Sequence, residues 1–225
     1  MNAASYLVGA PVMQARSSAK QTAIRTVETG LNQMAALILL ILLSPLCLMV
    51  VGIIVWIDSS PILFAHYRVG RDGRLFPCLK FRTMYVDAER MLAELLLNDP
   101  AARTEWLRDQ KLSNDPRITP IGHFLRKTSR DELPQLLNVL RGEMNLVGPR
   151  PITVSELTRY GGDRWHYLCV RPGMTGMWQV SGRNRTTYAE RVALDRWYVE
   201  KRTLLLDMKI LVKTVRVVLL RDGAQ

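Results

Sequence analysis

Hydrophobic residues concentrate in one run, Ala35 to Ile57, that contains no charged residue. A helix rises about 1.5 Å per residue, so a run of this length could cross a bilayer core of about 30 Å. Ser44-Pro45 interrupts the run near its middle. Because proline lacks an N–H and clashes with the preceding turn, the pattern predicts two helical arms rather than one straight helix. The freed backbone groups would need burial or a side-chain partner, such as the hydroxyl of Ser44.

Basic residues lie on both sides of this run. Positive charge favours the cytoplasmic side of a membrane, and here both flanks favour it. A helix–break–helix hairpin that enters and leaves on one side satisfies both flanks, whereas a single transmembrane helix remains the alternative. The flanking residues are Arg16, Lys20 and Arg25 before the run and Arg68, Arg71, Arg74, Lys80 and Arg82 after it.

The rest of the chain shows one hairpin pattern and several helical patterns. Asp72-Gly73 between apolar runs predicts a β-hairpin over residues 62–83. Apolar residues at helical spacing, or charged residues on an exposed helix, predict further helices over residues 87–97, 103–112, 188–200 and 204–220. The last of these mixes apolar residues with lysine and arginine, a pattern that fits a membrane-interface helix and a core-packed helix equally well.

The charge balance limits the class of partner. The formal net charge is +11, which suits nucleic acid, an anionic membrane surface or a phosphorylated substrate. Scattered cysteines without a CxxC pair argue against a disulfide framework and a zinc site. The three dispersed histidines read as core or surface residues, and no P-loop or GxGxxG motif occurs.

The densest chemical pattern lies between Asn114 and Pro151, where Asp131 and Glu132 follow a basic cluster. With Pro134 at the first position of the helix PQLLNVL, both carboxylates lie at its N-terminal end. The helix dipole and the arginines then favour the ionised form that a carboxylate nucleophile needs. The alternative is a capping box from Ser129 to Glu132, which would place proline inside the helix at a cost of about 3 kcal/mol.

Further cations stand beside turn-forming glycine or proline residues. Arginine binds phosphate oxygens in a bidentate manner, and a pyrophosphate needs several such donors. The candidate phosphate-binding residues are Arg126 with Lys80 and Arg82 in KFRTM, Arg150 in GPRP and Arg183 in SGRN.

These motifs carry a resemblance. KFRTM, NDPRIT, LRKTSRDELPQLLNVLRGEMNLVGPRP, RPGMTGMWQVSGRN and LLLDMKILVKT look like those of the bacterial sugar transferases, the monotopic phosphoglycosyl transferases. The similarity covers roughly residues 31–220 and is strongest to members that begin exopolysaccharide synthesis with a hexose-1-phosphate. The chain departs from the usual pattern at Arg130, commonly a leucine, and near Tyr67, where the usual glutamine is missing.

The resemblance implies a mechanism. Asp131 would attack the β-phosphate of a UDP-sugar, release UMP and form a phosphosugar–aspartyl intermediate, which undecaprenyl phosphate would then resolve. Glu132 would be the second member of the dyad, and Mg²⁺ would bind near Asp131 and the diphosphate. The residues matching cationic positions around the phosphates are Lys80, Arg126, Arg150 and Arg183.

We therefore expect an α+β, mainly helical monotopic enzyme at the cytoplasmic face of the bacterial inner membrane, an undecaprenyl-phosphate sugar phosphotransferase. Its expected parts are a flexible tail (1–30), a re-entrant membrane helix broken at Ser44-Pro45 (31–60) and a catalytic domain (61–225) with a small β-hairpin and interfacial amphipathic helices. Its partners would be a UDP-sugar, undecaprenyl phosphate and the bilayer, without nucleic acid; a homo-oligomer is possible, and the sugar stays open. The alternative is a non-enzymatic basic membrane module, against which the clustered Asp131-Glu132 speaks.

Overall fold

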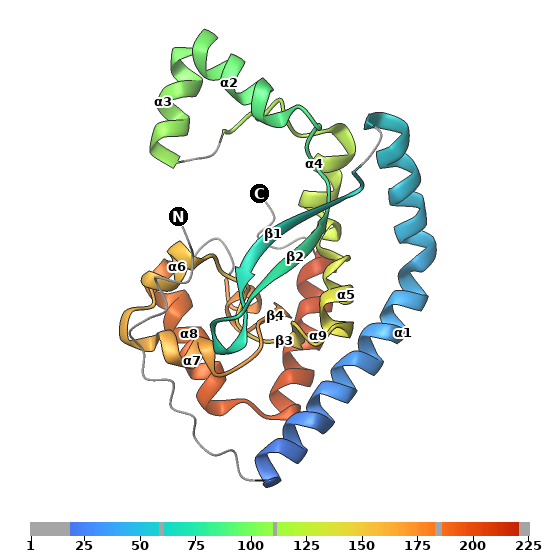
Figure 1. The fold of residues 1–225 in the computed structure, drawn as a ribbon, viewed down its shortest axis with the longest axis vertical. Helices are drawn as coiled ribbons and strands as arrows, with labels where there is room; N and C mark the ends of the chain where they lie inside the picture. The colour runs from blue at the N-terminus through green and yellow to red at the C-terminus, as the bar shows by residue number, and fades with distance from the viewer. Residues whose placement is uncertain (1–18, 59–60, 110–111, 183–185, 221–225) are drawn as a thin grey trace.

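The computed structural model describes residues 19–58, 61–109, 112–182 and 186–220. In Figure 1 a long helix, α1, runs along one side of the molecule, and the β1–β2 hairpin crosses its middle. The α2–α3 pair projects at the top, and the C-terminal helices gather below. This mostly helical arrangement with a small antiparallel sheet agrees with the predicted fold class.

Helix α1 (Ala19–Asp58) is continuous and keeps Pro45 inside it. It therefore differs from the predicted pair of separate arms, although it is visibly bowed in Figure 1. It also begins before residue 31, so residues 19–30 are helical where we expected a tail. The Ser44 hydroxyl donates to the Ile41 carbonyl at 2.8 Å. Proline 45 leaves that carbonyl without its usual N–H donor, which explains how the helix continues.

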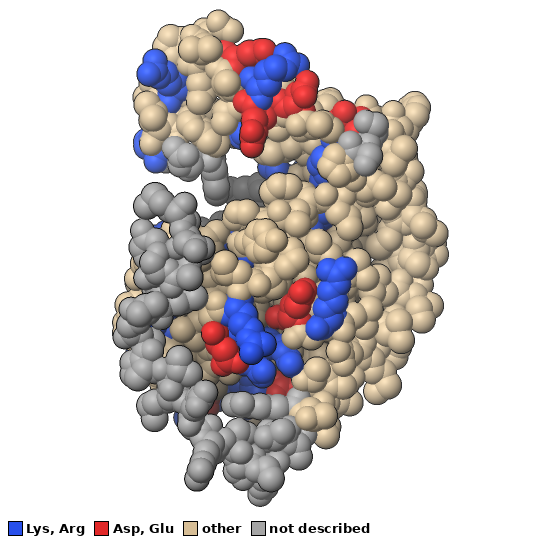
Figure 2. Space-filling view, in the orientation of Figure 1, with Lys and Arg blue, Asp and Glu red and all other residues tan. Residues whose placement is uncertain are grey.

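The two sides of α1 face different surroundings. Ala36, Val50 and Ile54 are buried against the rest of the protein. Apolar side chains on the other side are exposed, and the border that α1 forms in Figure 2 shows almost no charged residue. The stretch Thr26–Asp58 is the one helix within the described ranges that is long and apolar enough to cross a membrane. The exposed residues include Met34, Ile38, Ile41, Leu42, Leu48, Met49, Val55 and Trp56.

Polar contacts fasten both ends of α1 to the same folded body. Near the start of the helix, Glu28 accepts hydrogen bonds from Arg202 at 2.6 Å and from Asn145 at 3.1 Å. At its end, Asp58 pairs with Arg82 at 2.8 Å. The two ends of the apolar helix are therefore held on one domain.

The predicted hairpin is confirmed. Strands β1 (Leu63–Val69) and β2 (Leu75–Phe81) pair antiparallel, and the turn η2 (Arg71–Gly73) joins them. Asp72 and Gly73 have φ angles of 58° and 77°, a left-handed conformation that aspartate tolerates and glycine favours.

Four predicted helices are present with small shifts at their ends: α2 (Ala88–Asn98), α3 (Pro100–Asp109), α8 (Tyr188–Lys201) and α9 (Leu204–Leu220). Helices α2 and α3 pack on each other. In α9, Ile210 lies in the main core while Leu205 and Val212 are exposed. One side of α9 therefore packs in the core, and the other side leaves apolar residues exposed.

The middle of the chain contains short elements, of which the sequence predicted only the helix PQLLNVL, now α5. Helix α4 (Pro120–Lys127), the 3-10 turn η3 (Arg130–Glu132) and α5 (Gln135–Leu140) lead to β3 (Asn145–Val147), which pairs in parallel with β4 (Gly173–Thr175). A Cβ atom on Gly173 would lie 2.1 Å from the Gly148 nitrogen, so these two backbones can approach only through glycine. The remaining short elements are α6 (Val154–Thr158), η4 (Gly161–Asp163), α7 (Arg164–Leu168) and η5 (Trp178–Val180).

Candidate active site

The two predicted carboxylates lie on the 3-10 turn η3, between α4 and α5. Ser129, before the turn, has a left-handed φ of 55°, and its side chain makes no capping hydrogen bond. The capping-box alternative is therefore wrong. Pro134 stands one place before the first residue of α5, close to its predicted position. The tight turn buries Asp131 and leaves Glu132 partly buried beside it.

Lys80 joins the two carboxylates. Its Nζ lies 3.3 Å from Asp131 Oδ2 and 2.8 Å from Glu132 Oε1. Arg150 donates from Nη2 to the same Glu132 oxygen at 3.0 Å. Strand β2 supplies the lysine, and the segment after β3 supplies the arginine. Thus three segments that are distant in the sequence meet at the dyad.

The pKa values of the two carboxyl groups are shifted in opposite directions. Burial acts to raise the pKa of Glu132, but the charges of Arg150 and Lys80 outweigh it and lower this pKa to about 2. For Asp131, burial wins over the charge of Lys80, so its pKa lies above the ordinary value. We expected the surroundings to favour the ionised form at both positions. They lower the pKa of Glu132 as expected, but they raise the pKa of Asp131, because the turn buries the aspartate.

Arg126 belongs to the same cluster. Its Nε donates to Thr83 Oγ1 at 2.9 Å, and its positive charge acts to lower the pKa of Asp131. Helix α4 can approach Thr83 because Gly122 has no side chain: a Cβ atom there would lie 2.0 Å from the Thr83 carbonyl oxygen. Glycine at this position thus lets α4 present its arginine to the dyad.

Arg82 lies elsewhere. Its guanidinium pairs with the carboxylate and the main-chain carbonyl of Asp58, at the end of α1. The Asp58 carboxylate also accepts from the backbone N–H of Val86 at 2.8 Å. The structure therefore places Lys80, Arg126 and Arg150 around the dyad, whereas Arg82 binds the end of α1. Arg183, our remaining phosphate-binding candidate, lies outside the described residues.

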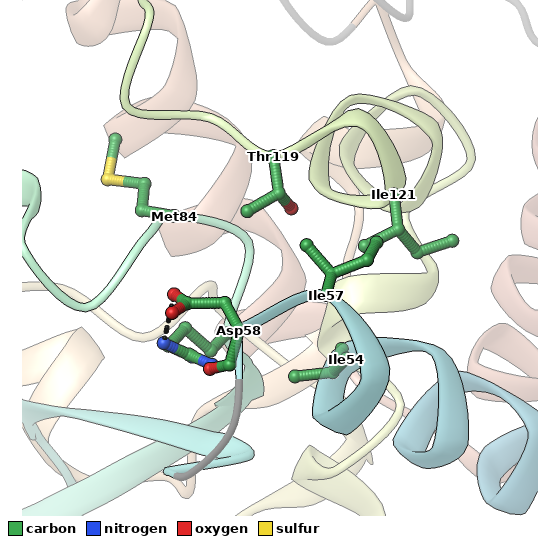
Figure 3. Close-up of a pocket in the computed structure, with 7 residues that line it drawn as sticks. Ile54, Ile57, Asp58, Met84, Thr119 and Ile121 are labelled. Carbon is green, nitrogen blue, oxygen red and sulfur yellow. Dashed lines mark hydrogen bonds and ion pairs between the residues drawn. The ribbon is translucent and has the colours of Figure 1, made fainter.

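A small cavity adjoins the Arg82–Asp58 pair. Figure 3 shows apolar side chains from the end of α1 facing Met84 and the start of α4, with Asp58 at the edge. Its lining is mainly apolar, and its charged groups already pair with each other. We therefore interpret the cavity as part of the junction between α1 and the rest of the domain. It is lined by Ile54, Ile57, Asp58, Arg82, Met84, Thr119 and Ile121.

Two residues near the dyad were not among our candidates. Phe64 pairs directly with Lys80 across the hairpin, and His66 pairs with Cys78. The alternation of a strand would have placed both on the lysine side, since residues separated by two share a face. We instead interpreted His66 as an isolated core or surface histidine.

The fit of Mg²⁺ can be judged from the ligand groups. Within the described ranges, no group of three or more His, Cys, Asp or Glu side chains could hold a metal ion. Magnesium is, however, commonly held by one or two carboxylates together with substrate phosphates and water. Asp131, with Glu132 beside it, fits that second kind of site.

Comparisons with known proteins identify the family of the chain. A family model described as "Bacterial sugar transferase" matches residues 23–221. The chain belongs to this family.

The relatives of this sugar transferase include proteins named as phosphotransferases and as exopolysaccharide production proteins. A Salmonella typhimurium protein named undecaprenyl-phosphate galactose phosphotransferase is 53% identical over 204 residues, which cover 89% of this chain and 42% of that protein. The exopolysaccharide production protein ExoY of Sinorhizobium fredii is 49% identical over 197 residues, which cover 88% of this chain and 87% of that protein. An undecaprenyl-phosphate glucose phosphotransferase of Komagataeibacter xylinus is 39% identical, over 81% of this chain and 34% of that protein. The chain thus spans less than half of the named phosphotransferases and most of ExoY.

Proposed function

We propose that this sugar transferase moves a hexose-1-phosphate from a UDP-sugar to undecaprenyl phosphate. The observation that carries the proposal is the buried Asp131, held beside Lys80 and within the field of Arg126. A carboxylate in this setting can attack phosphorus, while the cations stabilise the negative charge of the diphosphate. The galactose and glucose phosphotransferase names of two relatives support a hexose donor.

In the first half-reaction, an Asp131 carboxylate oxygen forms a bond to the β-phosphorus of the donor. The bond from that phosphorus to the oxygen bridging the two phosphates breaks, and UMP leaves with the electron pair. Lys80, Arg126 and Arg150 surround the turn and would bind the phosphate oxygens. A bound Mg²⁺ would supply further neutralisation of charge on the diphosphate.

In the second half-reaction, a phosphate oxygen of undecaprenyl phosphate attacks the same phosphorus and releases the Asp131 carboxylate. The product is a sugar diphosphate lipid. Glu132 stays ionised, because Arg150 and Lys80 hold its pKa at about 2. A carboxylate with so low a pKa suits orientation of Lys80 and Arg150 better than proton removal. We therefore assign Glu132 to positioning these cations.

The membrane arrangement is part of the proposal. A helix that crossed the bilayer would place Glu28 and Asp58 on opposite sides, yet both contact the domain that carries the dyad. We infer that α1 enters the membrane from the cytoplasmic side with its exposed apolar side toward lipid, as in a monotopic protein. Modification of cysteines introduced at Thr26 and at Pro61 from opposite sides of sealed vesicles tests this. Labelling of both from the same side is expected; labelling from different sides contradicts it.

The chemical test uses the purified protein without acceptor. Incubation with a UDP-hexose and Mg²⁺ should release about one UMP per protein and add the mass of one hexose phosphate to the intact chain. Asp131→Asn should abolish both signals, and Asp72→Asn, in the exposed hairpin turn, should change neither. An unmodified mass for the wild-type protein, with its UMP release continuing, would show direct transfer without the aspartyl intermediate.

A further inference from the structure

The face of the β1–β2 hairpin that carries Lys80 also carries two aromatic rings. The register pairs Phe64 with Lys80 and His66 with Cys78. Directly paired residues of an antiparallel sheet point to the same face, with Cβ atoms about 5 Å apart. The lysine reaches Asp131 from this face at 3.3 Å. The two rings and the nucleophile therefore border one surface.

The rings of Phe64 and His66 are stacked with nearly parallel planes, and we call this pair of rings the ledge. The centroids of Phe64 and His66 are 6.3 Å apart, and their planes differ by only 14°. Phe64 keeps 53% of its surface exposed, and His66 is also exposed. A pyranose has one face of C–H groups that packs well against an exposed aromatic ring and a rim of hydroxyls that needs polar partners.

His66 supplies a polar partner. Arg68 and Glu156, an ion pair at 3.1 Å, lie on one side of it and Lys80 on the other. Burial and these two cations, opposed by Glu156, lower the pKa of His66 below its usual value. A neutral imidazole carries one N–H donor and one nitrogen acceptor, so it can exchange hydrogen bonds with sugar hydroxyls in either direction.

We propose that Phe64 and His66 form the hexose subsite, with Phe64 packing on the sugar ring and His66 helping to select the hexose by a hydroxyl contact. The inference rests on the proposed function. The sugar is the part of the donor joined directly to the phosphorus that Asp131 attacks, whereas the uridine lies one phosphate further away. The isoprenoid of the acceptor is equally near its own phosphate, but a polar ring flanked by an ion pair suits hydroxyls better than hydrocarbon.

The test measures the first half-reaction alone, as UMP release without acceptor, with UDP-galactose and UDP-glucose in parallel. His66→Phe keeps a ring and removes the hydrogen bonds, so the ratio of kcat/KM for the two donors should change by about 3- to 10-fold. His66→Gln retains a donor and an acceptor and should keep most of the wild-type ratio. Phe64→Ala should raise KM about tenfold for both donors. Tyr67→Ala, 66% exposed on the opposite face, is the matched control and should change neither quantity.

Three results would overturn the inference. If the first half-reaction is unchanged while KM for undecaprenyl phosphate rises, the ledge binds lipid. If Phe64→Ala weakens inhibition by UMP as much as it weakens donor binding, the ledge binds the nucleotide. If both variants form the adduct with wild-type kinetics and selectivity, the ledge has no part in donor recognition, and the proposed function still stands. Absence of the adduct in the wild-type protein would instead remove the proposed function itself.

Discussion

Asp131 and Glu132 share the ammonium group of Lys80, yet the pKa of the first is raised and that of the second is lowered to about 2. The difference comes from burial and from a second cation. Burial dominates for the aspartate, whereas Arg150 adds its charge and a hydrogen bond to the glutamate. The two neighbouring carboxyl groups thereby differ: the proposed nucleophile has raised basicity, and Glu132 stays ionised at neutral pH.

The first prediction concerns Lys80 and pH. The lysine charge lowers the pKa of Asp131 against burial, so Lys80→Met should raise that pKa further. In the proposed mechanism Asp131 must be ionised to attack, so the acid limb of UMP release should move to higher pH. The rate at neutral pH should fall on the order of a hundredfold, since a preorganised cation is also lost.

Lys80→Arg is the matched control for this experiment. It keeps the charge and should leave the acid limb near its wild-type position, even where geometry lowers the rate. The measurement is the pH profile of single-turnover UMP release for all three proteins. An acid limb that stays in place in Lys80→Met would mean that the lysine does not act on Asp131.

The second prediction separates Arg82 from the phosphate-binding cations. Arg82 is 8% exposed and pairs with Asp58 at the end of α1, so its loss leaves the Asp58 carboxylate without its cationic partner. Arg82→Met should therefore lower the free energy of unfolding by about 3 kcal/mol. Any protein that remains folded should have a donor KM close to wild type.

Arg150→Met should show the contrasting result, with a raised donor KM, because Arg150 lies at the dyad. Thermal unfolding in detergent and donor kinetics are measured on both variants. Asp58→Asn should reproduce the stability loss of Arg82→Met only in part, because an amide can still accept hydrogen bonds. A donor KM that rises in Arg82→Met without loss of stability would return this arginine to the phosphate site.

A third prediction follows from a buried carboxyl group away from the site. Asp195 is 3% exposed and accepts a hydrogen bond from the Tyr160 hydroxyl at 2.8 Å. Burial raises its pKa from 3.8 to about 6, only partly offset by Tyr160 and Arg191. The folded state therefore binds this proton more tightly than the unfolded state, and its contribution to stability is lost as the pH rises from about 4 through 6.

Asp195→Asn removes this titration. Relative to wild type, the variant should gain about 3 kcal/mol of unfolding free energy between pH 4 and pH 8. Tyr160→Phe removes the hydrogen bond that lowers the pKa of Asp195. This variant should keep the pH dependence of stability and move its midpoint to higher pH. Urea unfolding in detergent at several pH values measures all three; parallel curves for wild type and Asp195→Asn would contradict the assignment.

Local patterns predicted the local parts of this fold. The turn at Asp72-Gly73 and the helices α8 and α9 depend on residues close in sequence, and they occur where the pattern indicated. The partner of Arg82 depends on where α1 ends, a contact across 24 positions of the chain. Two residues away, Lys80 instead reaches the dyad, and nothing in KFRTM distinguishes the two cations. The electrostatics of Asp131 likewise depend on burial, which the sequence of the turn does not encode.

The last prediction tests the proline in α1. Ser44 Oγ donates to the Ile41 carbonyl at 2.8 Å, the acceptor that would otherwise bond to the N–H of residue 45. Ser44→Ala should therefore lower stability by about 1 kcal/mol in the wild-type background, since it leaves this carbonyl without the serine donor. Pro45→Ala restores the backbone N–H and gives Ile41 a helical partner.

In the Pro45→Ala background, Ser44→Ala should consequently cost almost nothing, so the double-mutant cycle should give an interaction energy of about 1 kcal/mol. Unfolding measured in lipid nanodiscs is the suitable readout, because the exposed apolar side of α1 is then covered. Equal costs of Ser44→Ala in both backgrounds would mean that the hydroxyl does not substitute for the missing N–H. Pro45→Ala alone should also reduce UMP release if the bow in α1 sets the relation between Asp58 and Glu28, the two contacts through which the helix holds the domain.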